Sequence, residues 1–307
     1  MAVASRAKPE DFFDAGEWCA LTARSSWKGL LLVAHCWAVM GAAMAMGFIW
    51  PITIPIAVLV IGTRQLGLFV LMHDAAHAGL HRNRKVNDWV ATWLCTPTLR
   101  AYRPYHLQHH RFVQQSEDPD LVLSAPFPIT RASLARKVVR DLTGQTFYKQ
   151  RFGSLVQRIK ARAAGESALA LFAEEVGKER RFLIGNALGF LIFTAAGLWW
   201  VWLLMWLLPM MTWLPLVSRV RNIAEHALVI KDESDPLRHA RTTHASVLER
   251  LLVAPYWVNY HSEHHMFTAI PCWNLPKAHR LLQRRGVTAR MEVQPGYLSL
   301  LKMASAA

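Results

Sequence analysis

Two long apolar stretches of the chain predict membrane-spanning helices. The first covers residues 29–50 and continues almost without a loop into residues 51–72, where Arg64 is the only charge. A transmembrane helix needs about 20 apolar residues, so each half of this stretch can cross a bilayer. The second stretch, residues 182–217, is too long for one helix and suits two, separated near Gly197. The pattern therefore predicts an integral membrane protein with four transmembrane helices.

The segments between these stretches predict helices that do not cross the membrane. Residues 89–99 are apolar but too short to cross, so we expect them at the membrane interface or against other helices. Residues 131–181 are basic and amphipathic, which predicts a pair of helices lying on anionic lipid, with docking of a partner as the alternative. We expect an all-α fold, one domain over residues 1–307 with its core at about 29–283, and a helical cap on the cytoplasmic side.

Composition and charge support this picture and add an orientation. The chain is 53% hydrophobic, with 13 tryptophans and a net charge of +14. Apart from Arg64, arginine and lysine gather before residue 29, between residues 82 and 181, and after residue 218. The positive-inside rule then predicts that both termini and the middle segment face the cytoplasm. We expect no secretory signal peptide, and we expect the four cysteines to be reduced thiols because they lack paired metal-type spacing.

Histidines provide the candidate chemistry. Ten of the 14 lie in four short stretches: HDAAH (His73, His77) with His81 just beyond, HLQHH (His106, His109, His110), NIAEH (His226) and HSEHH (His261, His264, His265). Residues three or four apart share a helix face, so the imidazoles of each stretch can point the same way. Burying so many rings without a metal would leave ring nitrogens without partners. Because there are more imidazoles than one ion can hold, the pattern predicts two metal ions.

The residue types of the candidate ligands favour some metals over others but do not identify one. The chain has no HExxH motif, no Glu-x-x-His pair and no cysteine ligand set. An all-imidazole site for two ions at a membrane surface suits iron and oxygen chemistry, although zinc and copper also accept imidazole. We expect four other histidines to be ordinary polar residues: His35, His239, His244 and His279. His81 continues the i+4 face of HDAAH, but it lies beside RNRK, and solvation is the alternative.

Charged residues near these stretches are candidates for supporting roles. Metal-bound histidines usually donate their second N–H group to a carboxylate or carbonyl. Five acidic residues are near enough in sequence to accept such a bond: Asp74, Asp118, Asp120, Glu225 and Glu263. Arg64 and Gln65 lie inside the second predicted span, where we expect structural pairing.

At this point the sequence resembles a known family, the membrane fatty-acid desaturases and hydroxylases with three histidine boxes. HDAAH, HLQHH and HSEHH match the three boxes in order and spacing, and NRKVND, EDPDL and HHMFTAIPCWNLPKAH are similar to the family's flanking sequences. The resemblance covers about residues 55–283. It implies a non-haem di-iron centre on the cytoplasmic side, which activates O2 and removes hydrogen from an unactivated C–H bond of a lipid acyl chain.

The resemblance also implies a set of iron ligands. These are His73, His77, His106, His109, His110, His261, His264 and His265, with His226 matching the extra histidine that several members supply before the third box. Asn222 stands four residues before His226 and would complete the shell directly or through water.

The resemblance also implies an external electron donor. The chain has no HPGG motif of a fused cytochrome b5, so we expect a separate carrier of the ferredoxin or cytochrome b5 type. Such carriers are often acidic, and we expect one to dock on the basic residues of the cytoplasmic face. We expect lipid partners, no nucleic acid and a bacterial inner membrane.

Two alternatives to a desaturase stay open. One is a hydroxylase or ketolase of a lipid or carotenoid, because the same metal set serves both outcomes. The other is a membrane zinc protein, either a hydrolase or a transporter. Histidine boxes past the ends of the spans count against transport, and nine histidines are too many for a zinc hydrolase.

Overall fold

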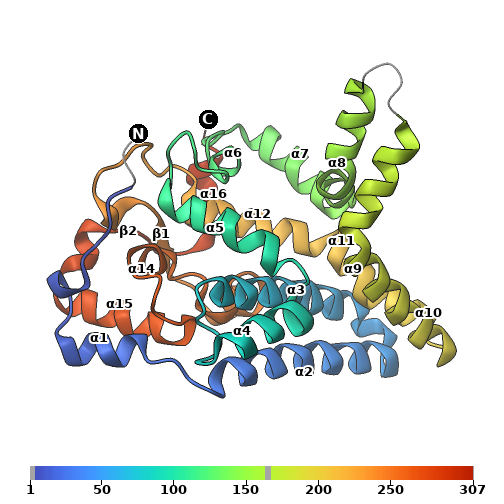
Figure 1. Ribbon diagram of the computed structural model, residues 1–307, viewed down its shortest axis with the longest axis horizontal. Helices are drawn as coiled ribbons and strands as arrows, with labels where there is room; N and C mark the ends of the chain where they lie inside the picture. The colour runs from blue at the N-terminus through green and yellow to red at the C-terminus, as the bar shows by residue number, and fades with distance from the viewer. Residues whose placement is uncertain (1–3, 163–166, 307) are drawn as a thin grey trace. The chain divides into compact units, whose positions relative to one another are not determined.

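The computed structural model of the protein describes residues 4–162 and 167–306 and is mainly helical (Figure 1). The chain divides into two compact units, which are described separately. Unit 1 comprises Met1–Ala38, Thr63–Leu134 and Val217–Ala307, and unit 2 comprises Val39–Gly62 and Ala135–Leu216.

Unit 1 contains most of the short helices. They are α1 (Ala15–Thr22), α4 (Arg84–Val90), α5 (Leu99–Arg111), α6 (Leu121–Ser124), α13 (Val247–Leu252), α14 (His261–Met266), α15 (Leu275–Arg284) and α16 (Tyr297–Ala304). Three longer helices lie partly in this unit: α2 (Lys28–Ile49), α3 (Ile54–Ala76) and α12 (Trp213–His226). Many of the helices in unit 1 are thus short and joined by loops and 3-10 turns, and the cytoplasmic cap stays a prediction.

Unit 1 also contains the strands that the all-α prediction lacks. β1 (Arg241–Thr243) and β2 (Glu292–Gln294) pair in parallel, with Thr242 opposite Val293. Thr242 also forms an antiparallel bridge with Tyr260, the residue before α14. Figure 1 shows α14 beside β1, and the small sheet therefore supports the helix that carries the third histidine box.

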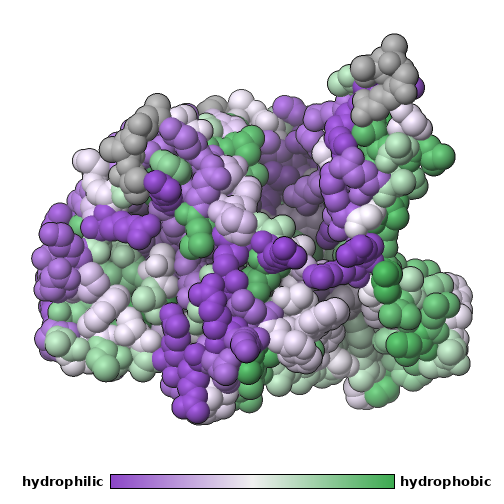
Figure 2. All heavy atoms as spheres, in the orientation of Figure 1, coloured by the Kyte–Doolittle hydropathy of each residue, from purple (hydrophilic) through white to green (hydrophobic). Residues whose placement is uncertain are grey.

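Unit 2 is built from longer apolar helices. They are most of α7 (Arg131–Leu142), α8 (Gln145–Ala161), α9 (Ala168–Ala195), α10 (Trp199–Trp202), a π-helical turn (Leu203–Leu207) and α11 (Leu208–Met211). Figure 2 shows hydrophobic residues gathered over α9 and α10, where Leu188, Leu191 and Trp199 are exposed. Exposed apolar side chains on long helices suit a lipid environment.

Three helices in the described part of the chain are long and apolar enough to cross a membrane: Lys28–Ile49, Pro51–Ala76 and Trp199–His226. They match the first, second and last predicted spans. The remaining predicted span falls in α9, which begins at Ala168, so its first half is charged and only its second half is apolar. The break at Gly197 is present, with φ of +74°, a value that favours glycine. The four-span count stays a prediction.

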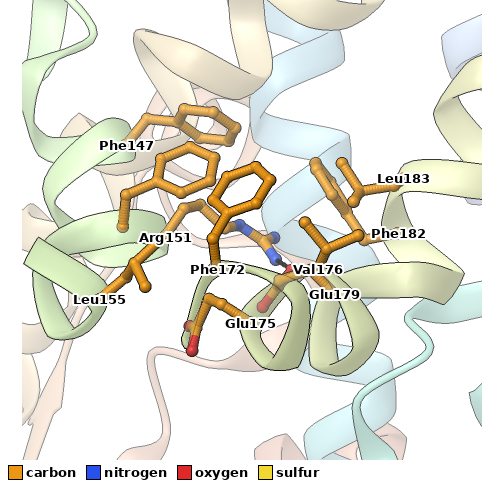
Figure 3. Close-up of a pocket in the computed structure, with 10 residues that line it drawn as sticks. Phe147, Arg151, Leu155, Phe172, Glu175, Val176, Glu179, Phe182 and Leu183 are labelled. Carbon is orange, nitrogen blue, oxygen red and sulfur yellow. Dashed lines mark hydrogen bonds and ion pairs between the residues drawn. The ribbon is translucent and has the colours of Figure 1, made fainter. Parts of the chain in front are cut away.

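In the described residues of the basic segment, 131–162 and 167–181, the structure has three elements in place of the predicted pair: α7, α8 and the first half of α9. α8 and α9 pack side by side, with Arg151 bonded to Glu179 and Arg158 2.6 Å from Glu174. Figure 3 shows the small cavity of about 50 Å³ between them, where aromatic side chains surround the Arg151 guanidinium. The interior of this hairpin therefore combines aromatic side chains with the Arg151–Glu179 ion pair.

Candidate metal centre

Four helices bring the histidine boxes together. His73 lies on the last turn of α3, and His77 follows one residue after that helix ends. α5 carries the second box, α12 ends at His226, and α14 carries the third box. The spacing of three or four residues places the rings of each box on one side of its helix, as the sequence predicts.

Nine of the predicted histidines form two groups, in each of which one ligand atom per residue lies within 4.8 Å of all the others. The five-histidine group contains His73, His77, His106, His110 and His264. The four-histidine group contains His109, His226, His261 and His265. Boxes two and three are thus divided between the groups, and the expectation of two ions has a geometric basis.

The distances between ring nitrogens fit a metal in each group. Nitrogens bound to one ion at about 2.1 Å lie roughly 3.0–3.4 Å apart in octahedral or tetrahedral sets. His106 Nε2 lies 2.9 Å from His77 Nε2 and 3.0 Å from His110 Nε2. His261 Nε2 lies 2.9 Å from His226 Nε2 and 3.1 Å from His265 Nε2. A neutral ring nitrogen makes one in-plane hydrogen bond, so meeting two others indicates a shared cation.

A buried nitrogen without a partner supports the same fit. Within the described residues, His73 Nε2 is buried and has no hydrogen-bond partner. The His73 ring lies 4.3 Å from the His106 ring and 4.4 Å from the His264 ring, measured between centroids. Such an atom costs free energy unless something binds it, and a metal ion would do so.

Burial keeps these imidazoles in the form that binds metal. It lowers the pKa of His77 to about 4. It also lowers the pKa values of His106, His110, His261, His264 and His265 well below the usual value. Neutral imidazole is the ligand form of histidine, so at neutral pH these rings need lose no proton to bind a metal.

The turn that carries His77 is held by residues outside the boxes. Asn87 Nδ2 donates to the Ala75 carbonyl at 2.9 Å, and Arg103 Nε donates to the Ala76 carbonyl at 3.0 Å. Arg103 also pairs with Asp88. The last carbonyls of a helix lack partners within the helix, and these side chains supply them. The NRKVND flanking sequence therefore has a structural role at the end of α3.

One predicted carboxylate stands directly behind a histidine of the four-histidine group. Asp118 Oδ1 lies 2.8 Å from His109 Nδ1, and both side chains are buried. Backbone N–H groups of Gln114 and Asp120 also donate to Asp118, at 2.9 and 2.8 Å. Asp120 itself lies 3.8 Å from His109 Nδ1. A carboxylate in this position fixes the ring so that Nε2 faces the group.

A second carboxylate lies near His261, at ion-pair distance and farther away than Asp118 is from His109. Glu225 Oε1 is 3.4 Å from His261 Nδ1 and accepts a hydrogen bond from Arg221 Nε at 2.6 Å. Sequence reasoning singled out Glu225 and missed Arg221. The available signal was their spacing, because residues four apart on a helix can pair.

Two other candidates prove to be structural. Glu263 bonds His279 Nδ1 at 2.6 Å and accepts from Thr242 at 2.5 Å, so its expected role behind a metal-binding histidine is wrong. Asp74 accepts from the backbone N–H group of Cys272 at 3.2 Å. Both acids tie the neighbourhood of a histidine box to distant parts of unit 1.

The remaining predicted polar residues have partners of their own. Arg64 donates to the Leu251 carbonyl at 3.1 Å, which confirms structural pairing. His81 is buried, so the alternative of solvation is wrong; its Nδ1 accepts from the Asn83 N–H group at 2.9 Å. His35 and His239 also form hydrogen bonds outside the two groups.

A polar cavity of about 150 Å³ adjoins the four-histidine group. Its lining includes His109, His226 and His261 together with Asn222, the predicted tenth ligand. Asn222 thus lines the same cavity as three histidines of this group, and its role as a metal ligand stays a prediction. Sequence reasoning missed the other polar lining residues, Tyr102, Tyr105, Ser124 and Arg221, which lack a motif.

Comparison with known proteins identifies the family. A family model described as fatty acid desaturase matches residues 48–294. Dihydrorhizobitoxine desaturase of Bradyrhizobium elkanii is 26% identical over 257 residues, which cover 79% of this chain and 69% of that protein. The sn-1 oleoyl-lipid 12-desaturase of Picosynechococcus is 24% identical over 282 residues, covering 84% and 77%. Beta-carotene ketolase of Paracoccus is 23% identical over 275 residues, covering 84% and 86%. Since the family model matches most of the chain, the protein belongs to the fatty acid desaturase family.

Proposed function

We propose that this protein is an O2-dependent lipid oxidoreductase that introduces a double bond into an acyl chain, using two histidine-bound iron ions. The observation that carries the proposal is the convergence of nine histidines, seven of them buried and two half-buried, into groups of five and four. Membership of the desaturase family supports a lipid substrate and a metal centre. We propose that residues 1–307 form one desaturase-like membrane domain.

The reaction joins an acyl chain, O2, two electrons and two protons, and yields an alkene and two waters. Bound iron would supply the reduction of O2 and the removal of hydrogen from carbon. The nine histidines would hold the ions, and Asp118 and Glu225 would fix two of the rings. Asn222 would complete the four-histidine group from the cavity. Burial of the ligand rings would keep bulk water away from the reacting atoms.

The proposal extends to the surroundings of the enzyme. Electrons would come from a separate carrier of the ferredoxin or cytochrome b5 type. Both termini and the metal centre would face the cytoplasm of a bacterial inner membrane, and four helices would cross it. The α7–α9 segment would lie on anionic lipid, because residues 131–162 carry an excess of basic residues.

One specific observation favours a second candidate reaction. The match to the ketolase from Paracoccus covers 84% of this chain, the same share as the match to the sn-1 oleoyl-lipid 12-desaturase. Hydroxylation or ketone formation on a lipid or carotenoid would use the same metal set and differ in where the reacting carbon lies. A membrane zinc protein is the alternative of another class, because imidazole also binds zinc.

The test is expression in a host with defined lipids, followed by mass spectrometry of total fatty acids and carotenoids. Wild type is compared with His264→Ala, which removes a member of the five-histidine group. His244→Ala serves as the control, because His244 is exposed and outside both groups.

Each outcome has a distinct meaning. A new unsaturated acyl chain with wild type and His244→Ala, but not with His264→Ala, supports the desaturase. A product heavier by oxygen assigns the second candidate. Zinc in the purified protein, with no O2 consumption on adding reductant and lipid, overturns the oxidoreductase.

A further inference from the structure

A buried ion pair on α12 stands behind the four-histidine group. Arg221 Nε donates to Glu225 Oε1 at 2.6 Å, and the two side chains are 16% and 5% exposed. The same Glu225 oxygen lies 3.4 Å from His261 Nδ1. Glu225 thus contacts both the Arg221 guanidinium and the His261 ring of the proposed metal centre.

The position of the Glu225 carboxylate depends on the Arg221 side chain, whereas the Asp118 carboxylate is held by backbone groups. Asp118 receives two backbone N–H groups besides His109, from Gln114 and Asp120. Among the described residues, the Glu225 carboxylate accepts one hydrogen bond, and its donor is Arg221. A buried carboxylate that loses its only cationic partner is strongly disfavoured. Without Arg221, Glu225 would therefore turn toward the cavity or water and leave His261.

We propose that Arg221 is a positioning residue for the four-histidine group: it holds Glu225 against His261 and thereby fixes that imidazole toward the second ion. This inference rests on the proposed metal centre. Ring orientation matters because His261 Nε2 lies 2.9 Å from His226 Nε2 and 3.1 Å from His265 Nε2. A rotated His261 ring would leave that set.

The effect should be confined to one of the two ions. In the described part of the chain, the carboxylates that pair with grouped histidines contact only His109 and His261. Both belong to the four-histidine group. Removing Arg221 should therefore weaken one ion and leave the ion of the five-histidine group in place.

The experiment measures metal binding by the purified full-length chain, so it does not depend on activity. Wild type, Arg221→Met, Arg221→Lys and Glu225→Gln are loaded with Co²⁺ or iron and titrated with a chelator. Arg219→Met is the matched control, because Arg219 lies two residues away on α12 and outside the cavity lining. We expect Arg221→Met to weaken one ion about 10- to 100-fold, as loss of a ligand's supporting partner does. Arg221→Lys should recover part of that loss, and Arg219→Met should bind like wild type.

The double variant Arg221→Met/Glu225→Gln separates positioning from a direct role in the cavity. If Arg221 acts through Glu225, its removal costs no further affinity once Glu225 is glutamine. This pair also removes both charges together, so it keeps the test possible if Arg221→Met alone does not fold.

Three results would overturn the inference. Arg221→Met could retain both ions with wild-type affinity, it could weaken both ions equally, or its effect could persist in the Glu225→Gln background. A wild-type chain that fails to bind two ions would instead remove the metal centre on which the inference rests, so the two failures are distinguishable.

Discussion

At the residue scale, two imidazoles of the candidate metal centre have a carboxylate near their second nitrogen. His109 has a buried carboxylate there, and His261 has one that is held by an arginine. A histidine whose Nδ1–H group is engaged presents Nε2 in a fixed direction. The supporting acids are thus as much part of the centre as the rings.

Asp118→Asn should weaken metal binding about 10- to 100-fold. The amide has one oxygen where the carboxylate has two, so its NH2 group would face an N–H donor of Gln114 or Asp120 and turn the side chain. Chelator titration of the purified protein measures the change. Glu117→Gln is the control, because Glu117 bonds its neighbour Ser116 and no histidine; equal affinities in the two variants would contradict the expectation.

The sequence supports prediction of the nine histidines better than prediction of their partners. Helical spacing alone places the rings of a box on one side. Glu263 lies between His261 and His264 in sequence, yet two residues along a helix turn a side chain to the other face, where it meets His279. Asp118 and Glu225 reach their histidines through tertiary contacts that no spacing rule contains.

Substitution of two adjacent threonines of β1 tests the buried hydrogen bonds of Glu263, which lies in the third histidine box. Thr242 donates to Glu263 at 2.5 Å, whereas the buried hydroxyl of Thr243 has no partner among the described residues. Thr242→Val should lower the free energy of unfolding by about 1–3 kcal/mol, because a carboxylate oxygen loses its donor. Thr243→Val should be neutral or stabilising. Thermal unfolding in detergent compares them, and equal melting temperatures would show that the Thr242 bond contributes nothing.

At the element scale, hydropathy predicts helices well where apolar residues are continuous. It fails at α9, because the helix continues through charged residues that a search for apolar runs excludes. It also fails at β1 and β2, since three-residue strands show no periodicity and their pairing partner lies far along the chain. These elements depend on tertiary contacts, such as the bridge between Thr242 and Tyr260.

Substitution of two glycines of α9 by alanine should have opposite effects on stability. A Cβ on Gly189 would lie 2.1–2.7 Å from three ring atoms of Trp202, whereas one on Gly185 would meet nothing within 4 Å. Gly189→Ala should therefore destabilise the packing of α9 on α10 by about 1–3 kcal/mol. Gly185→Ala should be neutral or stabilise the helix by up to about 1 kcal/mol. Melting temperatures of the two variants in the same detergent decide, and a Gly189→Ala protein as stable as wild type would contradict the close approach.

At the scale of the whole molecule, the division of boxes two and three between two ions was beyond sequence reasoning. His106 and His110 belong to one group and His109 to the other, although all three share α5. His264 likewise belongs to one group and His261 and His265 to the other, although all three lie on α14. Spacing predicts that the rings converge, but not how they are divided.

The net charge of +14 predicts salt-sensitive electron delivery. An acidic carrier should be steered to the basic face, and screening shortens the reach of this attraction from about 30 Å at ~10 mM salt to about 3 Å at ~1 M. We expect kcat/KM for the carrier to fall at least about tenfold over this range, while kcat at saturating carrier changes little. Stopped-flow reoxidation of the carrier measures both, and a flat profile would rule out electrostatic docking.

The convergence of nine histidines in unit 1 has a consequence for how stable the newly made protein is in a cell. Each group takes ligands from α5 and α14, and the α3 and α12 segments complete them. If the proposed centre binds iron, a newly made chain that finds none holds ring nitrogens that face one another, with His73 Nε2 left without a partner among the described residues. Such a chain should open more often and be removed by membrane proteases. The quantity of enzyme in the membrane would then follow iron supply even at constant synthesis.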